Sequence, residues 1–150
     1  MKDVNTVVVG FDGSPDGLRA VGAAGEIVAR DGVVHIVVAY KAPSDSEMER
    51  MWKSVPEEFH GVFDVLAGPK GYVTEAEKIL AQAGVSHLSR IVEDHPASAI
   101  LDTVDEVGAD LVVVGSRGLG RATRFVRGSV STNVANHAHT SVLIVHGDED

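Results

Sequence analysis

Apolar residues in this chain occur in short, nearly continuous runs separated by longer segments with a helical repeat. The runs lie within residues 2–11, 33–40, 85–94, 110–114 and 141–146. Short runs rich in β-branched residues and bounded by Gly or polar residues are typical of strands buried on both faces of a parallel sheet. The pattern therefore predicts five strands.

The segments between these runs carry apolar residues at helical spacing. Helices are predicted over residues 15–30, 71–83, 96–107 and 130–137. The first helix has a clear start signal, because Ser14 can cap it and Pro15 suits its first position. Helices thus alternate with strands along most of the chain.

Residues 41–70 interrupt the alternation. They contain three of the five prolines, many charges and Trp52, and only short helical pieces over 45–54 and 57–66 are predicted. A connection of this length is unusual in a compact domain. We interpret it as a variable insertion, or a lid over one end of the sheet, with Trp52 as its packing anchor.

The element order predicts one domain over residues 1–150 with an open, doubly wound α/β fold of the Rossmann-like type. Its five-stranded, mainly parallel sheet carries helices on both faces. In such sheets the ligand crevice lies outside the carboxyl ends of the strands, where the strand order reverses. Residues 10–14 and 115–129 follow the first and fourth strands, so both segments are expected at that edge.

Composition narrows the classes of function. The net charge of −9 argues against nucleic acid or an anionic membrane as the main partner, and the absence of Cys excludes disulfides and thiolate metal sites. No apolar run is long enough to span a bilayer, and the first residues have no signal-peptide layout. A cytoplasmic protein is the simplest expectation.

The distribution of charge is more informative than its sum. Residues 111–147 contain no Asp or Glu but four arginines: Arg117, Arg121, Arg124 and Arg127. One interpretation is a buried strand followed by a solvated loop. The other is a site for a small anion, from which carboxylates are kept away. Neither metal-ligand spacing of the seven His residues nor a partnered Ser nucleophile is visible.

Glycine spacing in the same segment favours the anion site. Gly115 and Gly118 are followed, after nine residues, by Gly128 and Ser129 at the start of a predicted helix. Glycine lets a backbone approach a ligand closely, and the first N–H groups of a helix have no acceptor within it. Together these features predict a phosphate cradle built mostly from backbone.

These residues resemble the universal stress protein family, in particular its nucleotide-binding branch. Gly115, Gly118, Gly128 and Ser129 match the family motif without a gap, residues 7–14 resemble its first strand and acidic residue, and residues 141–146 resemble its last strand. The resemblance extends to residues 94–97, at the start of the third predicted helix. It covers nearly the whole chain except residues 41–70, where the family varies.

The resemblance implies an ATP site, with Mg or Mn as a companion of the triphosphate, and a homodimer joined through residues 141–146. Cyclic AMP is the alternative ligand, because a backbone cradle can hold one phosphate as readily as three. The residues implied to contact the nucleotide, with Arg117 and Arg127 as the phosphate neighbours by position, are Gly10, Phe11, Asp12, Gly13, Ser14, Tyr40, Val114, Gly115, Ser116, Arg117, Gly118, Arg127, Gly128, Ser129 and Val130.

The expected function is that of a nucleotide-dependent stress or signalling switch. No Gly-x-x-x-x-Gly-Lys-Ser/Thr loop and no evident base for activating water are present, so hydrolysis is expected to be slow or absent. Two alternatives remain open: a weak ATPase, and a dimeric interaction module that works without nucleotide on an unidentified protein partner. We expect Gly118 and Gly128 to matter more for binding than any single arginine.

Overall fold

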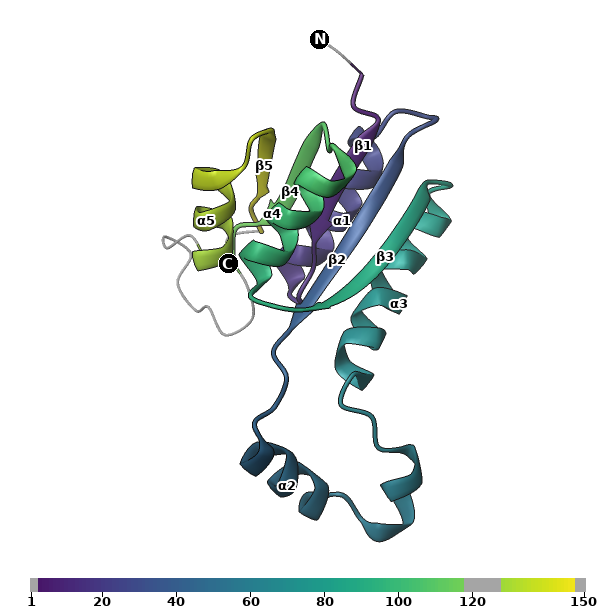
Figure 1. Ribbon diagram of the computed structural model, residues 1–150. Helices are drawn as coiled ribbons and strands as arrows, with labels where there is room; N and C mark the ends of the chain where they lie inside the picture. Colours follow the sequence, from purple (N-terminus) through teal and green to yellow (C-terminus); the bar gives the residue numbers. More distant parts are fainter. Residues whose placement is uncertain (1–2, 118–127, 148–150) are drawn as a thin grey trace.

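The computed structural model describes residues 3–117 and 128–147, and within them five parallel strands form one sheet (Figure 1). The strand order is β3-β2-β1-β4-β5. The strands are β1 (Thr6–Gly10), β2 (Val33–Tyr40), β3 (Ser86–Glu93), β4 (Leu111–Gly115) and β5 (Ser141–Val145). The predicted doubly wound α/β fold is confirmed, with a sheet that is parallel throughout.

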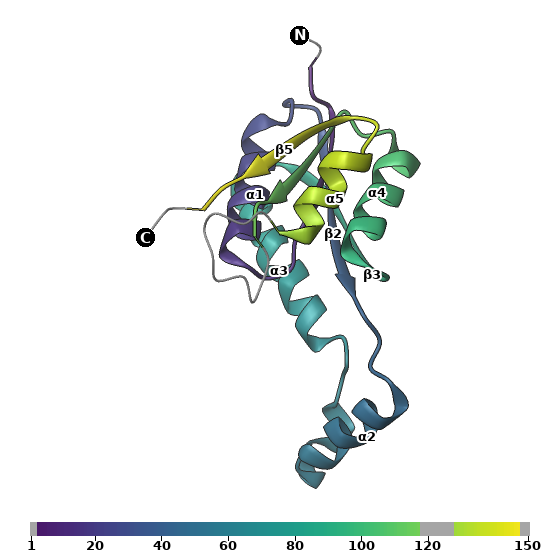
Figure 2. The ribbon, with the colours of Figure 1, turned by 90° about the vertical axis from the view of Figure 1, so that its left-hand side faces the viewer.

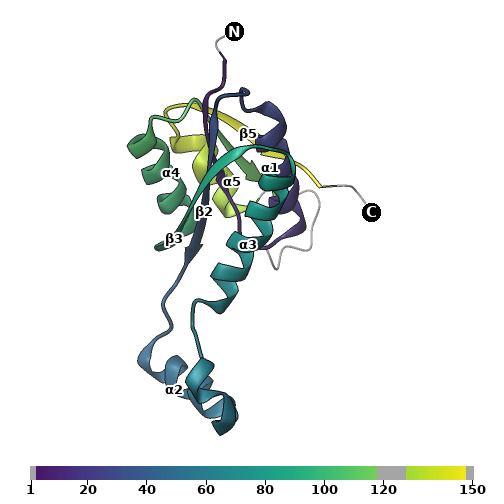
Figure 3. The ribbon, with the colours of Figure 1, turned by 90° about the vertical axis from the view of Figure 1, so that its right-hand side faces the viewer.

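Helices cover both faces of the sheet. They are α1 (Pro15–Ile27), α2 (Asp45–Ser54), α3 (Ala67–Gln82), α4 (Pro96–Val107) and α5 (Ser129–His137), with a 3₁₀ turn, η1, at Glu57–Val62. Viewed along the sheet, α1 and α3 lie on one side and α4 and α5 on the other (Figures 2 and 3). No helix within the described residues is long and apolar enough to cross a membrane.

The central strands supply both halves of the core. In β1, Val7 and Val9 face α1 and α3, whereas Val8 faces α4, and all three side chains are fully buried. Successive residues of a strand point to opposite faces, so a strand between two helical layers must be apolar at every position. This requirement explains the continuous Val runs of β1 and β4.

The chain reverses direction across the sheet between β1 and β4. From β1 it proceeds outward through β2 to β3, and α4 then carries it back to β4 and on to β5. The carboxyl ends of β1 and β4 therefore diverge into different helical layers, which leaves a crevice between them. Both glycine-bearing segments named above begin at this point.

Two α-helix boundaries differ from the prediction by three or more residues, and the helical piece predicted over 57–66 is a 3₁₀ turn that ends at Val62. Helix α1 ends at Ile27 instead of near Arg30, because the chain turns out at Val28 and the Ala29 N–H bonds to the Val4 carbonyl at 2.7 Å. Helix α3 begins at Ala67, four residues early, with Pro69 in its first turn. A first-turn proline loses no intrahelical hydrogen bond, so it does not mark the end of the irregular segment.

Residues 41–66 form an arm that extends away from the carboxyl end of β2 (Figure 1). In this structure the arm projects from the domain and does not cover the sheet edge. Trp52 packs within the arm, stacked on His60 with ring centroids 3.9 Å apart and edge-on to Phe63 at 5.5 Å. Its side chain is 42% exposed. Trp52 thus anchors the arm itself rather than attaching it to the sheet.

Part of the edge strand β3 departs from the burial that its residue types suggest. Leu88 is 61% exposed and the polar His87 and Arg90 are partly buried, whereas Ile91 and Val92 pack against the core. Leu88 lies beside His35 of β2, on the face covered by α4 and α5. Helix α4 lies over β1 and β2, and an ion pair between Arg90 and Glu106 at 2.7 Å joins it to β3.

Candidate functional site

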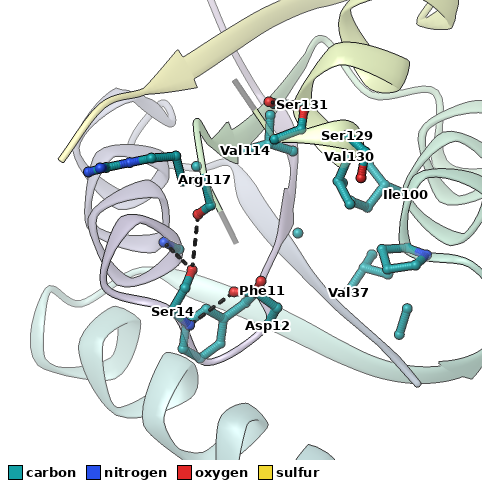
Figure 4. Close-up of a pocket in the computed structure, with 16 residues that line it drawn as sticks. Phe11, Asp12, Ser14, Val37, Ile100, Val114, Arg117, Ser129, Val130 and Ser131 are labelled. Carbon is teal, nitrogen blue, oxygen red and sulfur yellow. Dashed lines mark hydrogen bonds between the residues drawn. The ribbon is translucent and has the colours of Figure 1, made fainter. Parts of the chain in front are cut away.

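A cavity of about 340 Å³ opens between the carboxyl ends of β1 and β4 (Figure 4). Its apolar walls come from β2, β4 and α4, and its polar rim comes from the segments that follow β1 and β4. The lining residues are Gly10, Phe11, Asp12, Ser14, Gly17, Val37, Ala39, Pro96, Ile100, Val114, Gly115, Arg117, Gly128, Ser129, Val130 and Ser131. The cavity lies where the reversal of strand order predicts a ligand crevice.

The first wall is the turn from β1 into α1. The Phe11 N–H continues the strand pairing by donating to the Val37 carbonyl at 3.0 Å. Asp12 Oδ1 then accepts the Ser14 N–H at 2.9 Å, and Ser14 Oγ accepts the Gly17 N–H at 3.1 Å. These two local bonds fix the turn before any ligand arrives. Asp12 therefore has a structural role in shaping the rim.

Gly13 supports this turn from behind. Its φ of +86° lies in the left-handed region that side chains disfavour, and a Cβ there would collide with the Tyr72 ring of α3. Glycine is therefore required at this position by the backbone and by the neighbouring ring. Gly13 does not line the cavity, so its contribution is to the shape of the wall.

The second wall begins with a closure between Ser116 and the start of α5. The Ser116 carbonyl accepts the Gly128 N–H at 2.6 Å and the Ser131 hydroxyl at 3.2 Å. The Ser131 hydroxyl is also 2.9 Å from the Gly128 carbonyl. The two ends of the segment 117–127 are thus held together, although they are separated by the whole of that segment in sequence.

Helix α5 presents its amino terminus to the cavity. Its N-cap is Gly128, no side chain caps its first turn, and Ser129, Val130 and Ser131 all line the cavity. The first N–H groups of a helix have no acceptor within it and carry the positive end of its dipole. This end of the cavity is therefore suited to an anionic group.

Arg117 is engaged elsewhere. Its Nε lies 3.2 Å from Asp16 Oδ2, and its side chain points away from the cavity, whereas its carbonyl faces Ser14 (Figure 4). Arg117 thus lies at the site, as expected, but it lines the cavity with its backbone and not with its guanidinium. Its guanidinium is paired with a carboxylate that the sequence pattern did not single out.

Gly115 is required by packing at the end of β4. A Cβ at this position would lie 2.8 Å from the Asp16 carbonyl carbon and 3.0 Å from its oxygen. Such distances to backbone cannot be relieved by a side-chain rotation. The first glycine of the motif therefore allows α1 to approach β4, in addition to lining the cavity.

Most of the residues implied by the resemblance come together. Gly10, Phe11, Asp12, Ser14, Val114, Gly115, Arg117, Gly128, Ser129 and Val130 line the cavity, whereas Gly13, Tyr40 and Ser116 lie outside its lining. The Tyr40 carbonyl accepts the Asp94 N–H at 3.1 Å, and the neighbouring Ala39 lines the cavity. Gly118 and Arg127 fall outside the described residues.

Sequence reasoning missed the apolar part of the cavity and the acid behind it. Gly17, Val37, Ala39, Pro96, Ile100 and Ser131 also line the cavity, and Asp16 lies behind its rim. The end of β2 and the start of α4 are expected near any ligand at this edge, so Ala39 and Pro96 could have been found from topology. Asp16 could not, because its partner is a hundred residues away.

The sequence matches the universal stress protein family over residues 4–146. The chain belongs to that family. A universal stress protein of Mycobacterium tuberculosis strain H37Rv is 32% identical over 151 aligned residues, which cover 97% of this chain and 99% of the relative. A putative universal stress protein of Staphylococcus haemolyticus is 28% identical, with 99% of this chain and 88% of the relative covered.

Solved structures of universal stress proteins share the fold. One of them, determined in complex with cAMP, is 35% identical to this chain, has a TM-score of 0.71, and covers 97% of this chain and 98% of its own length. A universal stress protein from Archaeoglobus fulgidus, in complex with dAMP, is 22% identical with a TM-score of 0.61 and a coverage of 97% and 99%. The second likeness is of the fold alone.

Proposed function

We propose that this universal stress protein binds an adenine nucleotide in the cavity between β1 and β4. The observation that carries the proposal is the amino terminus of α5, which meets the cavity without a side-chain cap. A phosphate group would accept from the Ser129 and Val130 N–H groups and from the Ser129 hydroxyl. A base is suited to the apolar walls formed by Val37, Ala39 and Ile100.

The remaining polar group of the rim fits a sugar. Asp12 lines the cavity on the β1 side, opposite the amino terminus of α5. A carboxylate accepts hydrogen bonds only, so it suits ribose hydroxyl groups and disfavours phosphate oxygens. We therefore assign the ribose to the Asp12 side, between the apolar walls and the phosphate.

Cyclic AMP is our first candidate ligand and ATP the second. The solved relative in complex with cAMP is 35% identical over nearly the whole chain, which favours the same ligand class here. ATP is implied by the resemblance to the nucleotide-binding branch of the family. The described residues contain no cluster of three or more acidic or His side chains suited to a metal ion. A divalent cation arriving with ATP would be held mainly by the phosphate oxygens.

Binding, rather than turnover, would be the activity of this site. In hydrolysis, a side chain must orient and deprotonate the attacking water. Asp12, the one acidic side chain among the described lining residues, already accepts the Ser14 N–H. We infer a nucleotide-dependent switch, in which the loaded and empty forms differ in the partner they bind.

Calorimetric titration of the purified full chain with cyclic AMP, AMP, ADP and ATP tests the proposal. We expect saturable binding, with cyclic AMP bound most tightly and with no steady release of phosphate from ATP. Cyclic GMP serves as the matched control for the base. The absence of binding of every adenine nucleotide at millimolar concentration would leave only the nucleotide-independent interaction module.

We further propose that two copies associate through β5. This strand is at the edge of the sheet, and Val142, Leu143, Ile144 and Val145 are each only partly buried. An exposed apolar edge strand invites pairing with another chain, and a second copy supplies an identical edge. Sedimentation equilibrium should give a dimer mass at micromolar concentration, and a monomer at all concentrations would contradict this assembly.

A further inference from the structure

Asp16 is an almost fully buried carboxylate beside the cavity. It lies in the first turn of α1 with 7% of its side chain exposed. Its Oδ2 accepts two bonds, one from Arg117 Nε at 3.2 Å and one from the Ser116 hydroxyl at 3.0 Å. One acid on α1 thus holds two successive residues that follow β4.

The chain beyond β5 covers this ion pair. A Cβ at Gly147 would collide with Asp16 Oδ1 and would lie 3.1 Å from Arg117 Nη2. Gly147 therefore packs directly against both partners. Such close cover excludes water, and exclusion of water strengthens the attraction between opposite charges.

The burial of Asp16 determines where Arg117 can go. If the guanidinium moved to a ligand phosphate, it would leave a carboxylate buried without its counter-charge, which is strongly unfavourable. Asp12 and Arg117 are the two charged side chains among the described residues that line the cavity. Because Asp16 neutralises the Arg117 guanidinium, the described residues that line the cavity offer a phosphate no free side-chain cation.

We propose that Asp16 is a positioning residue that sets the charge of the nucleotide the site accepts. By holding Arg117, it leaves the phosphate to the amino terminus of α5, whose partial charge of roughly +0.5 suits the single charge of a cyclic phosphate better than several charges. A triphosphate carries several negative charges, so the lack of a free Arg117 guanidinium weakens its binding more. This inference rests on the proposed nucleotide site and deepens it to a preference for singly charged phosphates.

The test is the ratio of affinities for ATP and cyclic AMP in Asp16→Asn. Asparagine keeps the shape and removes the negative charge, so Arg117 is no longer neutralised. We expect the ATP-to-cyclic AMP affinity ratio to rise by about tenfold at low salt, and the gain to shrink as salt screens the added charge. Calorimetry at two ionic strengths measures both effects, and circular dichroism verifies the fold.

Two further variants separate charge from structure. Arg117→Gln should lower the ratio, because Asp16 is then uncompensated. Since that variant could fail to fold, Asp16→Asn/Arg117→Gln is the decisive one, in which both charges are absent and the ratio should return to within about threefold of the wild type. A ratio that stays unchanged in Asp16→Asn, or rises equally in the double variant, overturns the inference.

The outcomes also separate this inference from the proposed function. If the wild type binds nucleotides but the ratio of ATP to cyclic AMP affinity does not change with the charge at position 16, the nucleotide site is retained and the proposed role of Asp16 is rejected. If the wild type binds no adenine nucleotide, the proposed function and the proposed role of Asp16 are both rejected.

Discussion

Three helices start at the edge of the cavity, and the amino termini of α1 and α5 are built in opposite ways. In α1, Ser14 caps the Gly17 N–H and the first position is Pro15, which has no N–H to satisfy. In α5, the N-cap is Gly128 and no side chain caps the first turn. The first helix completes its own hydrogen bonding, and the second does not.

Two similar Gly-Ser sequences therefore have different roles in the structure. Gly13-Ser14 and Gly128-Ser129 read alike, but Ser14 is the N-cap and is 2% exposed, whereas Ser129 lies one position inside its helix and is exposed. A serine at the N-cap accepts a hydrogen bond from an N–H group of the first turn. A serine after the N-cap leaves these N–H groups, and the positive end of the helix dipole, open to a ligand. Whether the serine is the N-cap or the residue after it thus distinguishes a structural helix start from a ligand-binding one.

The largest expected effect comes from filling the open terminus of α5. Ser129→Asp places a carboxylate in the first turn, where it should satisfy the helix dipole and repel a phosphate. We expect nucleotide affinity to fall by about a hundredfold, with thermal stability unchanged or slightly raised. Calorimetry and circular dichroism give the two quantities.

Thr132→Asp is the matched control, because it adds the same charge to the same helix at an exposed position outside the lining of the cavity. Its affinity should change by no more than about threefold, through long-range repulsion that salt screens. Equal losses in the two variants would mean that net charge, and not the helix terminus, governs binding.

A smaller effect is expected at Gly115, where the end of β4 packs against the start of α1. Gly115→Ala brings a Cβ against the Asp16 backbone, and we expect a loss of about 1–3 kcal/mol in the free energy of unfolding. Gly22→Ala in α1 is the control, since nothing lies within 4 Å of its added Cβ. That change should stabilise α1 by up to about 1 kcal/mol. Urea titrations followed by circular dichroism compare them.

The smallest effect separates the two serines. Ser14→Ala removes the cap of α1 and should cost about 1 kcal/mol of stability. Because Ser14 also lines the cavity, nucleotide affinity should fall as well, but by less than in Ser129→Ala. Ser129→Ala should leave stability unchanged and weaken nucleotide binding by a few-fold, through the lost hydroxyl. If Ser14→Ala weakens binding more than Ser129→Ala does, the open terminus of α5 is not the phosphate site.

The central layers could be predicted because local and global requirements coincide there. The Val runs of β1 and β4 permit only strands buried on both faces, and the carboxyl ends of those strands then place Gly10 and Gly115 at one edge. The cavity follows from this topology. The identity of its ligand does not, since a backbone cradle accepts phosphates of different length.

The features that escaped prediction depend on distant partners. Asp16 in a first helical turn looks like an ordinary dipole-favouring acid, and its pairing with Arg117 is set by tertiary contact alone. Leu88 follows the apolar pattern of a core strand, yet β3 extends beyond the helix that would cover it. The direction of residues 41–66 likewise depends on packing that the local pattern does not encode.

The position of Trp52 has a practical consequence for spectroscopy. Trp52 is the chain's single tryptophan, and it is stacked on His60 in the projecting arm, outside the lining of the cavity. Intrinsic tryptophan emission therefore reports on the arm, and a ligand that only fills the cavity should leave it unchanged. A change in that emission when nucleotide is added would mean that occupancy of the cavity alters the arm.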